Sequence, residues 1–292
     1  MTLEKMKIPF YIVDVFAEKK YAGNQLAVFM DAKDLSSEEM QRIACEINFA
    51  ESTFVTHIQP ENNTATIRIF TPVSEMQFAG HPIIGTSWVL LNKIFNNQPQ
   101  SMTLSVPIGE ILVQQTTDLV WLQAAQPAFM DVFSHEGLMS FTNLVTADFD
   151  ATFPIQEVST GSAFVIVPLQ NKKALENIHF DLDKMKEWLQ KNCKTNHRAL
   201  YFYCLEEEKI STRMFCIEKN ALIEDAATGS ASTCLQAFLL KYYAPEIQLV
   251  NHQGDCINRP SQIYFDGKRS DTYFDIKIGG KTQFLAKGEW EV

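Results

Sequence analysis

Residues 68–87 read RIFTPVSEMQFAGHPIIGTS, and residues 213–232 read RMFCIEKNALIEDAATGSAS. Each stretch begins with a strand-like Arg-x-Phe run, continues through a loop and reaches a glycine that opens an apolar helix. The two arginines are 145 residues apart and the two helix-opening glycines are 149 apart, so the second loop is four residues longer. This internal echo predicts two related α+β halves.

The flanking sequence extends the same mixture of strands and helices. Apolar runs at 9–16 and 26–30 are typical of strands, and a helix capped by Ser36 or Ser37 is predicted to follow. Further strand-like runs lie at 53–58, 64–70, 103–106, 110–114, 164–167, 199–204 and 213–217, and helical patterns at 81–91, 183–191 and 230–240. The pattern predicts an α+β protein without long linkers.

The composition is typical of an acidic globular protein. Of the 292 residues, 46% are hydrophobic and 21% are charged, which provides apolar material for packed cores and excludes a mainly disordered chain. The formal net charge of −10 argues against a nucleic-acid-binding surface, and we expect no membrane-spanning segment and no export signal. The six cysteines form no CxxC pair, so we expect free thiols and a cytoplasmic protein.

The two glycine-opened helices are candidate anion-binding sites. A helix start presents unpaired backbone N–H groups and the positive end of the helix dipole, which suit a carboxylate or a phosphate. The first start, FAGHPIIGTS at 78–87, lacks the lysine of a P-loop, so nucleotide binding is poorly supported. In the second, EDAATGSAS at 224–232, Asp225 lies five residues before Ser230. A small organic acid suits such a site better.

Two titratable side chains each allow two interpretations. Phe49 and Phe54 flank Glu51 and would desolvate its carboxylate so that it carries a proton near neutral pH; alternatively, Glu51 is an exposed acid at a strand end. His81 is either a functional group at the helix start or an ordinary cap or packing residue. The other histidines are widely spaced, so no metal site is expected.

Taken together, these motifs resemble the PhzF-like family, named for the phenazine-biosynthesis isomerase. DVFAEKKYAGNQLAVF at 14–29 is similar to the family's opening strand–turn–strand, and NFAESTFV at 48–55 is similar to the signature around its catalytic glutamate. The two stretches quoted first resemble its helix starts, and QGDCINRPSQI at 253–263 resembles its late loop. The resemblance runs almost from end to end of the chain.

The resemblance implies a diaminopimelate epimerase-like fold, in which each of two similar α+β domains is a curved mixed sheet wrapped around a central helix. We expect the first domain at 1–118, completed by the C-terminal strand 280–292, and the second at 119–279. The epimerases place a catalytic cysteine just before each glycine-containing helix start. The corresponding residues here look like Ala79 and Thr228, so racemisation by two thiols is not expected.

The resemblance also implies an activity: a cofactor-independent isomerase that moves a proton within a small cyclic or unsaturated carboxylate. Carried over, Glu51 is the proton carrier, and His81 and Asp225 position or polarise the substrate. The implied substrate-binding residues are Asn24, Gly80, Gly229 and Ser230. No cofactor or metal is required by this chemistry, no nucleic-acid or membrane partner is expected, and the family suggests a homodimer.

The sequence departs from the family pattern at two positions. Gln25 and Ala226 stand where the family commonly has proline, and Ala226 is expected to loosen the loop that carries Asp225. These departures leave the implied catalytic residues intact and the substrate undetermined. Two other functions stay open: a non-catalytic protein that binds small carboxylates, and a thiol-free racemase in which Glu51 and Asp225 flank one carbon.

Overall fold

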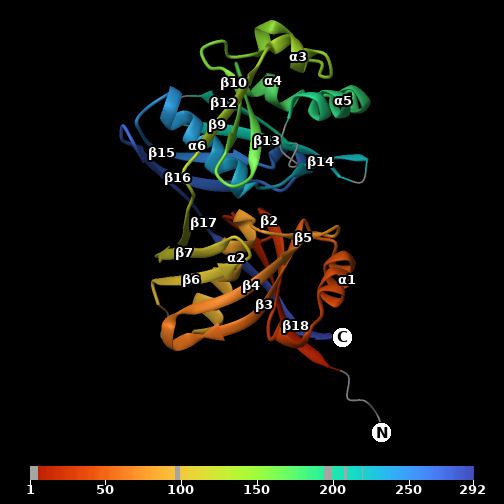
Figure 1. Cartoon of the computed structure of the whole chain (residues 1–292), viewed down its shortest axis with the longest axis vertical. Coiled ribbons are helices and arrows are strands. Elements are labelled where there is room, and N and C mark those ends of the chain that lie inside the picture. Colours follow the sequence, from red (N-terminus) through yellow and green to blue (C-terminus); the bar gives the residue numbers. More distant parts are fainter. Residues whose placement is uncertain (1–5, 96–98, 194–198, 207–208, 219) are drawn as a thin grey trace. The chain divides into compact units, whose positions relative to one another are not determined.

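The computed structural model describes residues 6–95, 99–193, 199–206, 209–218 and 220–292. The chain divides into two compact units, one made of 1–123 with 279–292 and the other of 124–278. Each unit combines a mixed sheet with few helices (Figure 1). The domain boundaries expected from the sequence, 1–118 with 280–292 and 119–279, stay a prediction.

The elements of the first unit follow one another with short connections. In chain order they are β1 (Lys7–Val15), β2 (Asn24–Phe29), η1 (Ala32–Asp34), α1 (Ser37–Ile47), β3 (Glu51–Gln59), η2 (Pro60–Asn62), β4 (Thr64–Phe70), β5 (Glu75–Met76), α2 (Gly80–Val89), the π-helical turn η3 (Leu90–Ile94), β6 (Ser101–Val106), β7 (Gly109–Thr116), β8 (Leu119–Gln123) and β18 (Thr282–Glu291).

The second unit begins at β9 and extends into β17, whose last two residues belong to the first unit. Its elements are β9 (Ala128–Phe133), α3 (His135–Met139), η4 (Thr146–Asp148), β10 (Ile155–Ser159), β11 (Ala163–Leu169), α4 (Lys172–Glu176), α5 (Leu182–Asn192), β12 (Ala199–Glu206), β13 (Lys209–Glu218), β14 (Ala221–Asp225), α6 (Gly229–Tyr242), β15 (Glu246–Gln253), η5 (Asp255–Ile257), β16 (Ser261–Arg269) and β17 (Phe274–Gly280).

The two sheets have the same topology. In the first unit, β1–β2–β3–β4–β6–β7 pair in the order antiparallel, parallel, antiparallel, parallel, antiparallel, and β5 adds antiparallel to β4. In the second unit, β10–β11–β12–β13–β15–β16 repeat this order, and β14 adds antiparallel to β13. The structure therefore confirms the two similar α+β halves that the sequence echo predicts.

Each sheet wraps around its glycine-opened helix. The helix α2 contacts β1, β2, β3, β6, β7, β8 and β18, and every residue of it except Trp88 is buried. The helix α6 contacts β10, β11, β15 and β16. Both helices are buried on nearly every side, because a helix enclosed by a sheet has little surface that faces solvent.

The helix α1 determines where β3 begins. Ser36 is its N-cap and forms a capping box with Glu39: the Glu39 N–H donates to Ser36 Oγ over 3.2 Å, and the Ser36 N–H donates to the Glu39 carboxylate over 2.8 Å. The helix ends at Asn48, whose left-handed φ of 55° turns the chain back toward the sheet. Glu51 is then the first residue of β3.

A bidentate ion pair occupies the same place in both units. Arg68 Nε and Nη2 donate to the Glu75 carboxylate over 2.7 and 2.6 Å, and Arg213 donates in the same way to Glu224 over 2.9 and 2.7 Å. Each guanidinium also lies over the phenylalanine two residues further on, 5.1 Å and 4.7 Å from the ring centre. The four additional residues of the second half thus lie between Arg213 of β13 and Glu224 of β14.

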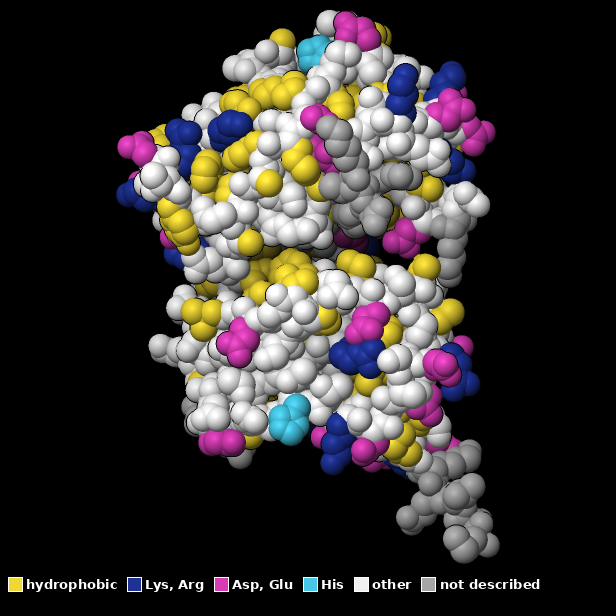
Figure 2. All heavy atoms as spheres, viewed as in Figure 1, with side chains coloured by type: hydrophobic (Ala, Val, Ile, Leu, Met, Phe, Trp, Pro, Cys, Tyr) yellow, Lys and Arg dark blue, Asp and Glu magenta, His cyan; other side chains and the backbone are white. Residues whose placement is uncertain are grey.

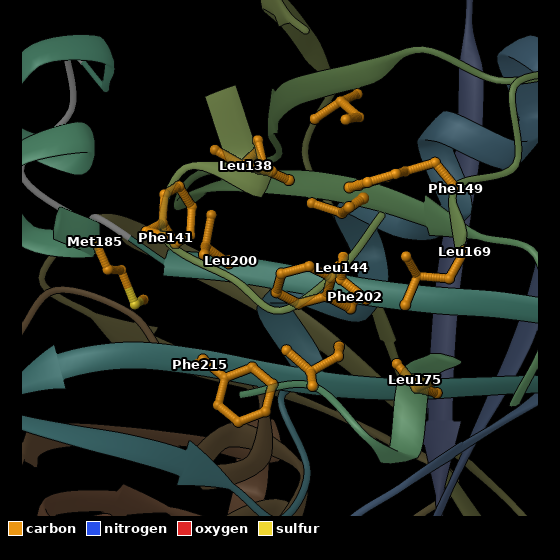
Figure 3. Packing of buried hydrophobic residues seen from close by; sticks show 14 of the residues in the cluster. Leu138, Phe141, Leu144, Phe149, Leu169, Leu175, Met185, Leu200, Phe202 and Phe215 are labelled. Atoms are coloured by element: carbon orange, nitrogen blue, oxygen red, sulfur yellow. The ribbon is translucent and has the colours of Figure 1, made fainter. Parts of the chain in front are cut away.

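The strand β12 is buried on both of its faces. Leu200 and Phe202 point into a cluster with side chains of α3, α5 and β13 (Figure 3). The alternate residues Tyr201 and Tyr203 contact α6 instead: the Tyr201 hydroxyl is hydrogen-bonded to this helix, and the Tyr203 ring lies 6.0 Å from that of Phe238. This period-two alternation places the Tyr201 hydroxyl beneath the first turn of α6.

The surface charges are mixed. Figure 2 shows acidic and basic side chains interspersed over the described residues of one face. No helix formed by the described residues has both the length and the apolar character needed to cross a membrane.

Candidate active site

Four predicted site residues of the first unit, Asn24, Glu51, Gly80 and His81, come together at the start of α2. His81 is the second residue of α2 and Glu51 the first of β3. His81 Nε2 lies 3.4 Å from Glu51 Oε2, and His81 Nδ1 lies 3.4 Å from the side-chain nitrogen of Asn24, the first residue of β2. The parallel pairing of β2 with β3 brings the starts of these strands to one edge, where Gly80 opens α2.

His81 is an uncharged imidazole at neutral pH. Only 4% of its side chain is exposed, and this burial lowers its pKa to about 3, although a hydrogen bond with the Gln25 backbone acts in the opposite direction. Its Nε2 atom is buried and makes no hydrogen bond to the described residues. The side chain of Glu51, by contrast, is 17% exposed. The Glu51–His81 pair thus combines a carboxylate that is partly accessible to solvent with a buried, neutral imidazole ring.

The burial of His81 predicts a pH dependence of stability. The pKa of His81 is about 3 in the folded protein and near 6.5 in the unfolded chain. Below pH 6.5, His81 therefore binds a proton in the unfolded chain but stays neutral in the folded protein. Stability is therefore lost as the pH falls from 6.5 toward 3, by up to about 1.4 kcal/mol per pH unit. Urea unfolding between pH 7 and pH 4 should show this loss in the wild type and a smaller one in His81→Asn. Equal slopes would contradict the prediction.

The predicted residues of the second unit gather at the start of α6. Asp225 is the last residue of β14, Thr228 is the N-cap of α6, and Gly229 and Ser230 are its first two residues. The Thr228 hydroxyl donates to Asp225 Oδ2 over 2.6 Å. Ser230 is half-buried and holds the place in α6 that His81 holds in α2, the second residue of the glycine-opened helix.

The loop that carries Asp225 is held by hydrogen bonds and does not rely on a proline ring. The Ala226 carbonyl accepts from Ser261 Oγ over 2.9 Å. The side chain of Gln253 binds both the Asp225 carbonyl and the Thr228 N–H. Gln253 is a residue that the sequence analysis did not single out; its only sequence signal is its place in the late-loop motif.

The starts of α2 and α6 differ from those of the other helices. Ser36, Ser134, Asn171 and Asp181 cap α1, α3, α4 and α5 with a side-chain oxygen. The N-caps of α2 and α6 are Ala79 and Thr228, and neither side chain accepts from a first-turn N–H. First-turn amides without a cap are suited to an anionic group. Ala79 and Thr228 are also the two positions at which the resemblance places the epimerase cysteines.

The described residues offer no evident metal-binding cluster: no three of their histidine, cysteine, aspartate and glutamate side chains are grouped so that they could hold an ion. The polar side chains at the two helix starts are Asn24, Glu51 and His81 in the first unit, and Asp225, Thr228 and Ser230 in the second. Carboxylates, a neutral imidazole and hydroxyls are suited to proton transfer and to binding an acid.

Comparison with known proteins shows the family of the chain. The family model for phenazine biosynthesis-like proteins, PhzC-PhzF, matches residues 13–288. The trans-2,3-dihydro-3-hydroxyanthranilate isomerase of Pseudomonas aeruginosa is 33% identical over 284 residues, which cover 96% of this chain and 98% of the relative. An uncharacterized isomerase of Pasteurella multocida is 29% identical, with 96% of this chain and 93% of the relative covered.

Solved structures agree with the curated relatives. The PhzF family protein of Bacillus anthracis has a TM-score of 0.87 and 26% identity, covering 98% of this chain and all of that one. A hydroxyproline epimerase from Agrobacterium vitis has a TM-score of 0.64 at 10% identity, covering 100% of this chain and 94% of the other, and shares the fold alone. The chain belongs to the PhzC-PhzF family of phenazine biosynthesis-like proteins and is an enzyme of the isomerase class.

Proposed function

We propose that this isomerase moves a proton between two carbon atoms of a small cyclic or unsaturated carboxylate, with Glu51 as the proton carrier. The observation that carries the proposal is a reachable carboxylate 3.4 Å from a buried neutral imidazole, whose facing nitrogen makes no hydrogen bond to the described residues. A buried polar atom left unpaired costs about 1–3 kcal/mol, and a catalytic role is one of the explanations for such an atom. Three relatives at 31–33% identity named trans-2,3-dihydro-3-hydroxyanthranilate isomerases support the substrate class.

In the proposed reaction, Glu51 acts first as a base and then as an acid. Its carboxylate takes a proton from one carbon, the C–H electron pair moves into the adjacent conjugated system, and the same carboxyl group returns the proton to another carbon. The substrate and product are isomers, so the step balances without any other reactant. Neutral His81 faces the Glu51 carboxyl group with Nε2 and forms no permanent ion pair with it, which leaves this group able to take up and release a proton.

The remaining site residues are proposed to bind and polarise the substrate. The amides of Gly229 and Ser230 lie in the uncapped first turn of α6 and would hold a carboxylate or a developing anion. Gly80 would offer the same kind of donor at α2, and Asn24 a side-chain amide. Asp225 would accept a hydrogen bond from a substrate amine or hydroxyl group.

Hydrogen exchange in D2O tests this function directly. Proton transfer through Glu51 places solvent deuterium on a substrate carbon, and NMR shows which carbon receives it. Wild-type protein should exchange a hydrogen of trans-2,3-dihydro-3-hydroxyanthranilate or of a related acid, and Glu51→Gln should not. Binding of several acids without exchange of any would favour the alternative, a non-catalytic carboxylate-binding protein.

We also propose a homodimer that works in the cytoplasm. None of the six cysteines, all within the described residues, forms a disulfide, which suits a reducing compartment. Symmetric dimers are the commonest assembly of soluble oligomers. Sedimentation equilibrium is expected to give twice the chain mass of 33.2 kDa. A single-chain mass at micromolar concentration would contradict the dimer.

A further inference from the structure

The side chain of Gln253 makes four hydrogen bonds around the loop that carries Asp225. Its Nε2 donates to the Asp225 carbonyl over 2.9 Å and to Thr228 Oγ1 over 3.0 Å. Its Oε1 accepts from the Thr228 N–H over 3.2 Å and from the Tyr201 hydroxyl over 3.0 Å. Gln253 is only 1% exposed, so these contacts replace water completely. One amide therefore ties both ends of the loop to the strand β15.

Two of these partners determine which way the amide faces. A backbone carbonyl can only accept and a backbone N–H can only donate, so the Gln253 side chain cannot be flipped without breaking both bonds. Its NH2 group must then donate to the Thr228 hydroxyl. Because the Thr228 oxygen already accepts this bond, its single hydrogen is available for Asp225 Oδ2, which lies 2.6 Å away. The backbone thus fixes the orientation of the amide, and the Thr228 hydroxyl connects this amide to the Asp225 carboxylate.

We propose that Gln253 and Thr228 are positioning residues for Asp225, which hold Oδ2 as a hydrogen-bond acceptor and so fix the orientation of the carboxylate. The proposal rests on the proposed role of Asp225 in substrate binding. A hydrogen bond donated by the Thr228 hydroxyl to Oδ2 favours the charged form of this carboxylate over its protonated form. The orientation of the carboxylate is therefore decided before a substrate arrives, which avoids the cost of ordering it during the reaction.

A second layer of uncharged polar groups holds Gln253 in turn. The Asn251 side chain donates to the Tyr201 hydroxyl over 2.8 Å and to Ser232 Oγ over 3.1 Å, and the Thr212 hydroxyl donates to Asn251 Oδ1 over 2.9 Å. Burial raises the pKa of Tyr201 to about 12, so its hydroxyl keeps its hydrogen at neutral pH. These residues come from β12, β13, α6 and β15, which makes the layer part of the unit's core.

The first half of the chain provides an internal control. The register that pairs Met214 with Asp225 pairs Ile69 with Met76, so the position of the acid is apolar in the first half. The N-cap equivalent to Thr228 is Ala79, and the last residue of β6, equivalent to Gln253 at the end of β15, is Val106. The acid, the hydroxyl and the amide are present together in one half and absent together from the other. This agrees with a shared role and not with a general requirement of the fold.

The test uses two variants of Thr228 that differ in the hydroxyl group. Thr228→Val keeps the β-branched shape and removes the hydroxyl, whereas Thr228→Ser keeps it. The carboxyl ¹³C signal of Asp225, identified by its absence in Asp225→Asn, should titrate about one pH unit higher in Thr228→Val than in the wild type. In Thr228→Ser it should titrate close to the wild-type value. Gln253→Met removes the other end of the chain of bonds and should shift the signal in the same direction.

Activity gives the second readout, with trans-2,3-dihydro-3-hydroxyanthranilate as the substrate. Thr228→Val should lower kcat about ten- to a hundredfold with a much smaller change in KM, and Thr228→Ser should recover most of the rate. An unchanged Asp225 titration in folded Thr228→Val and Gln253→Met would overturn the positioning role. A shifted titration in a protein that exchanges no substrate hydrogen would support the positioning role and contradict the proposed isomerase reaction instead.

Discussion

Replacing Glu51 with glutamine is expected to lower the rate of proton transfer by about a thousandfold or more while the protein stays folded and still binds its ligand. Glutamine has the same shape as glutamate but neither accepts nor returns a proton near neutral pH. Because one group is proposed to perform both transfers, no second residue would replace it. The neighbouring imidazole is not a substitute base with a useful pKa, since burial lowers the pKa of His81 to about 3.

The experiment compares wild type, Glu51→Gln and the control Glu61→Gln in D2O. Glu61 lies exposed in η2 of the same unit, so its variant carries the same change of charge away from the site. Each protein is incubated with a panel of cyclic and unsaturated carboxylic acids, and deuterium uptake is followed by NMR. Calorimetric titration shows whether the acids bind, and thermal unfolding shows whether the variants fold. Full exchange by folded Glu51→Gln would remove Glu51 from the mechanism.

The second large effect is expected from Gly254→Ala. Gly254 follows Gln253 directly and has a φ of 80°, a backbone conformation that alanine adopts only with strain. An added Cβ would lie 2.3 Å from the Arg259 carbonyl oxygen and 2.6 Å from that of Ala226. Both neighbours are backbone atoms, so the loop that carries Asp225 has to move. We expect a loss of unfolding free energy of about 3 kcal/mol or more, together with a loss of activity.

Gly161→Ala is the matched control for this variant. Gly161 lies in the same unit and also has a positive φ, 132°, but an added Cβ there would meet no atom within 4 Å. This control retains the backbone strain and lacks the collision, so it should cost about 1–3 kcal/mol and leave the exchange rate near that of the wild type. Chemical denaturation of both variants measures the difference. Equal destabilisation by the two substitutions would show that the close approach at Gly254 contributes nothing.

The sequence alone determined the architecture of each half. Arg-x-Phe strands, longer polar connections and glycine-opened apolar helices recur at nearly constant offsets, and the structure repeats the same pairing order in both sheets. Such patterns can be recognised in a sequence, because the alternation of apolar and polar residues, helix capping and tight turns all depend on residues that are neighbours in the chain. The N-cap Ser36 and the helix starts at Gly80 and Gly229 are local in the same sense.

The chemical state of the site depends on contacts that form only in the folded protein. In the sequence, Glu51 had an equally simple interpretation as an exposed strand-end acid, and His81 as a cap. The low pKa of His81 and its distance to Glu51 come from β2, β3 and α2 meeting at one edge of a sheet. Gln253 is 25 residues from Thr228, and no periodicity connects them. Desolvation and hydrogen-bond polarity depend on which atoms of distant segments surround a group, and that information exists only once the chain has folded.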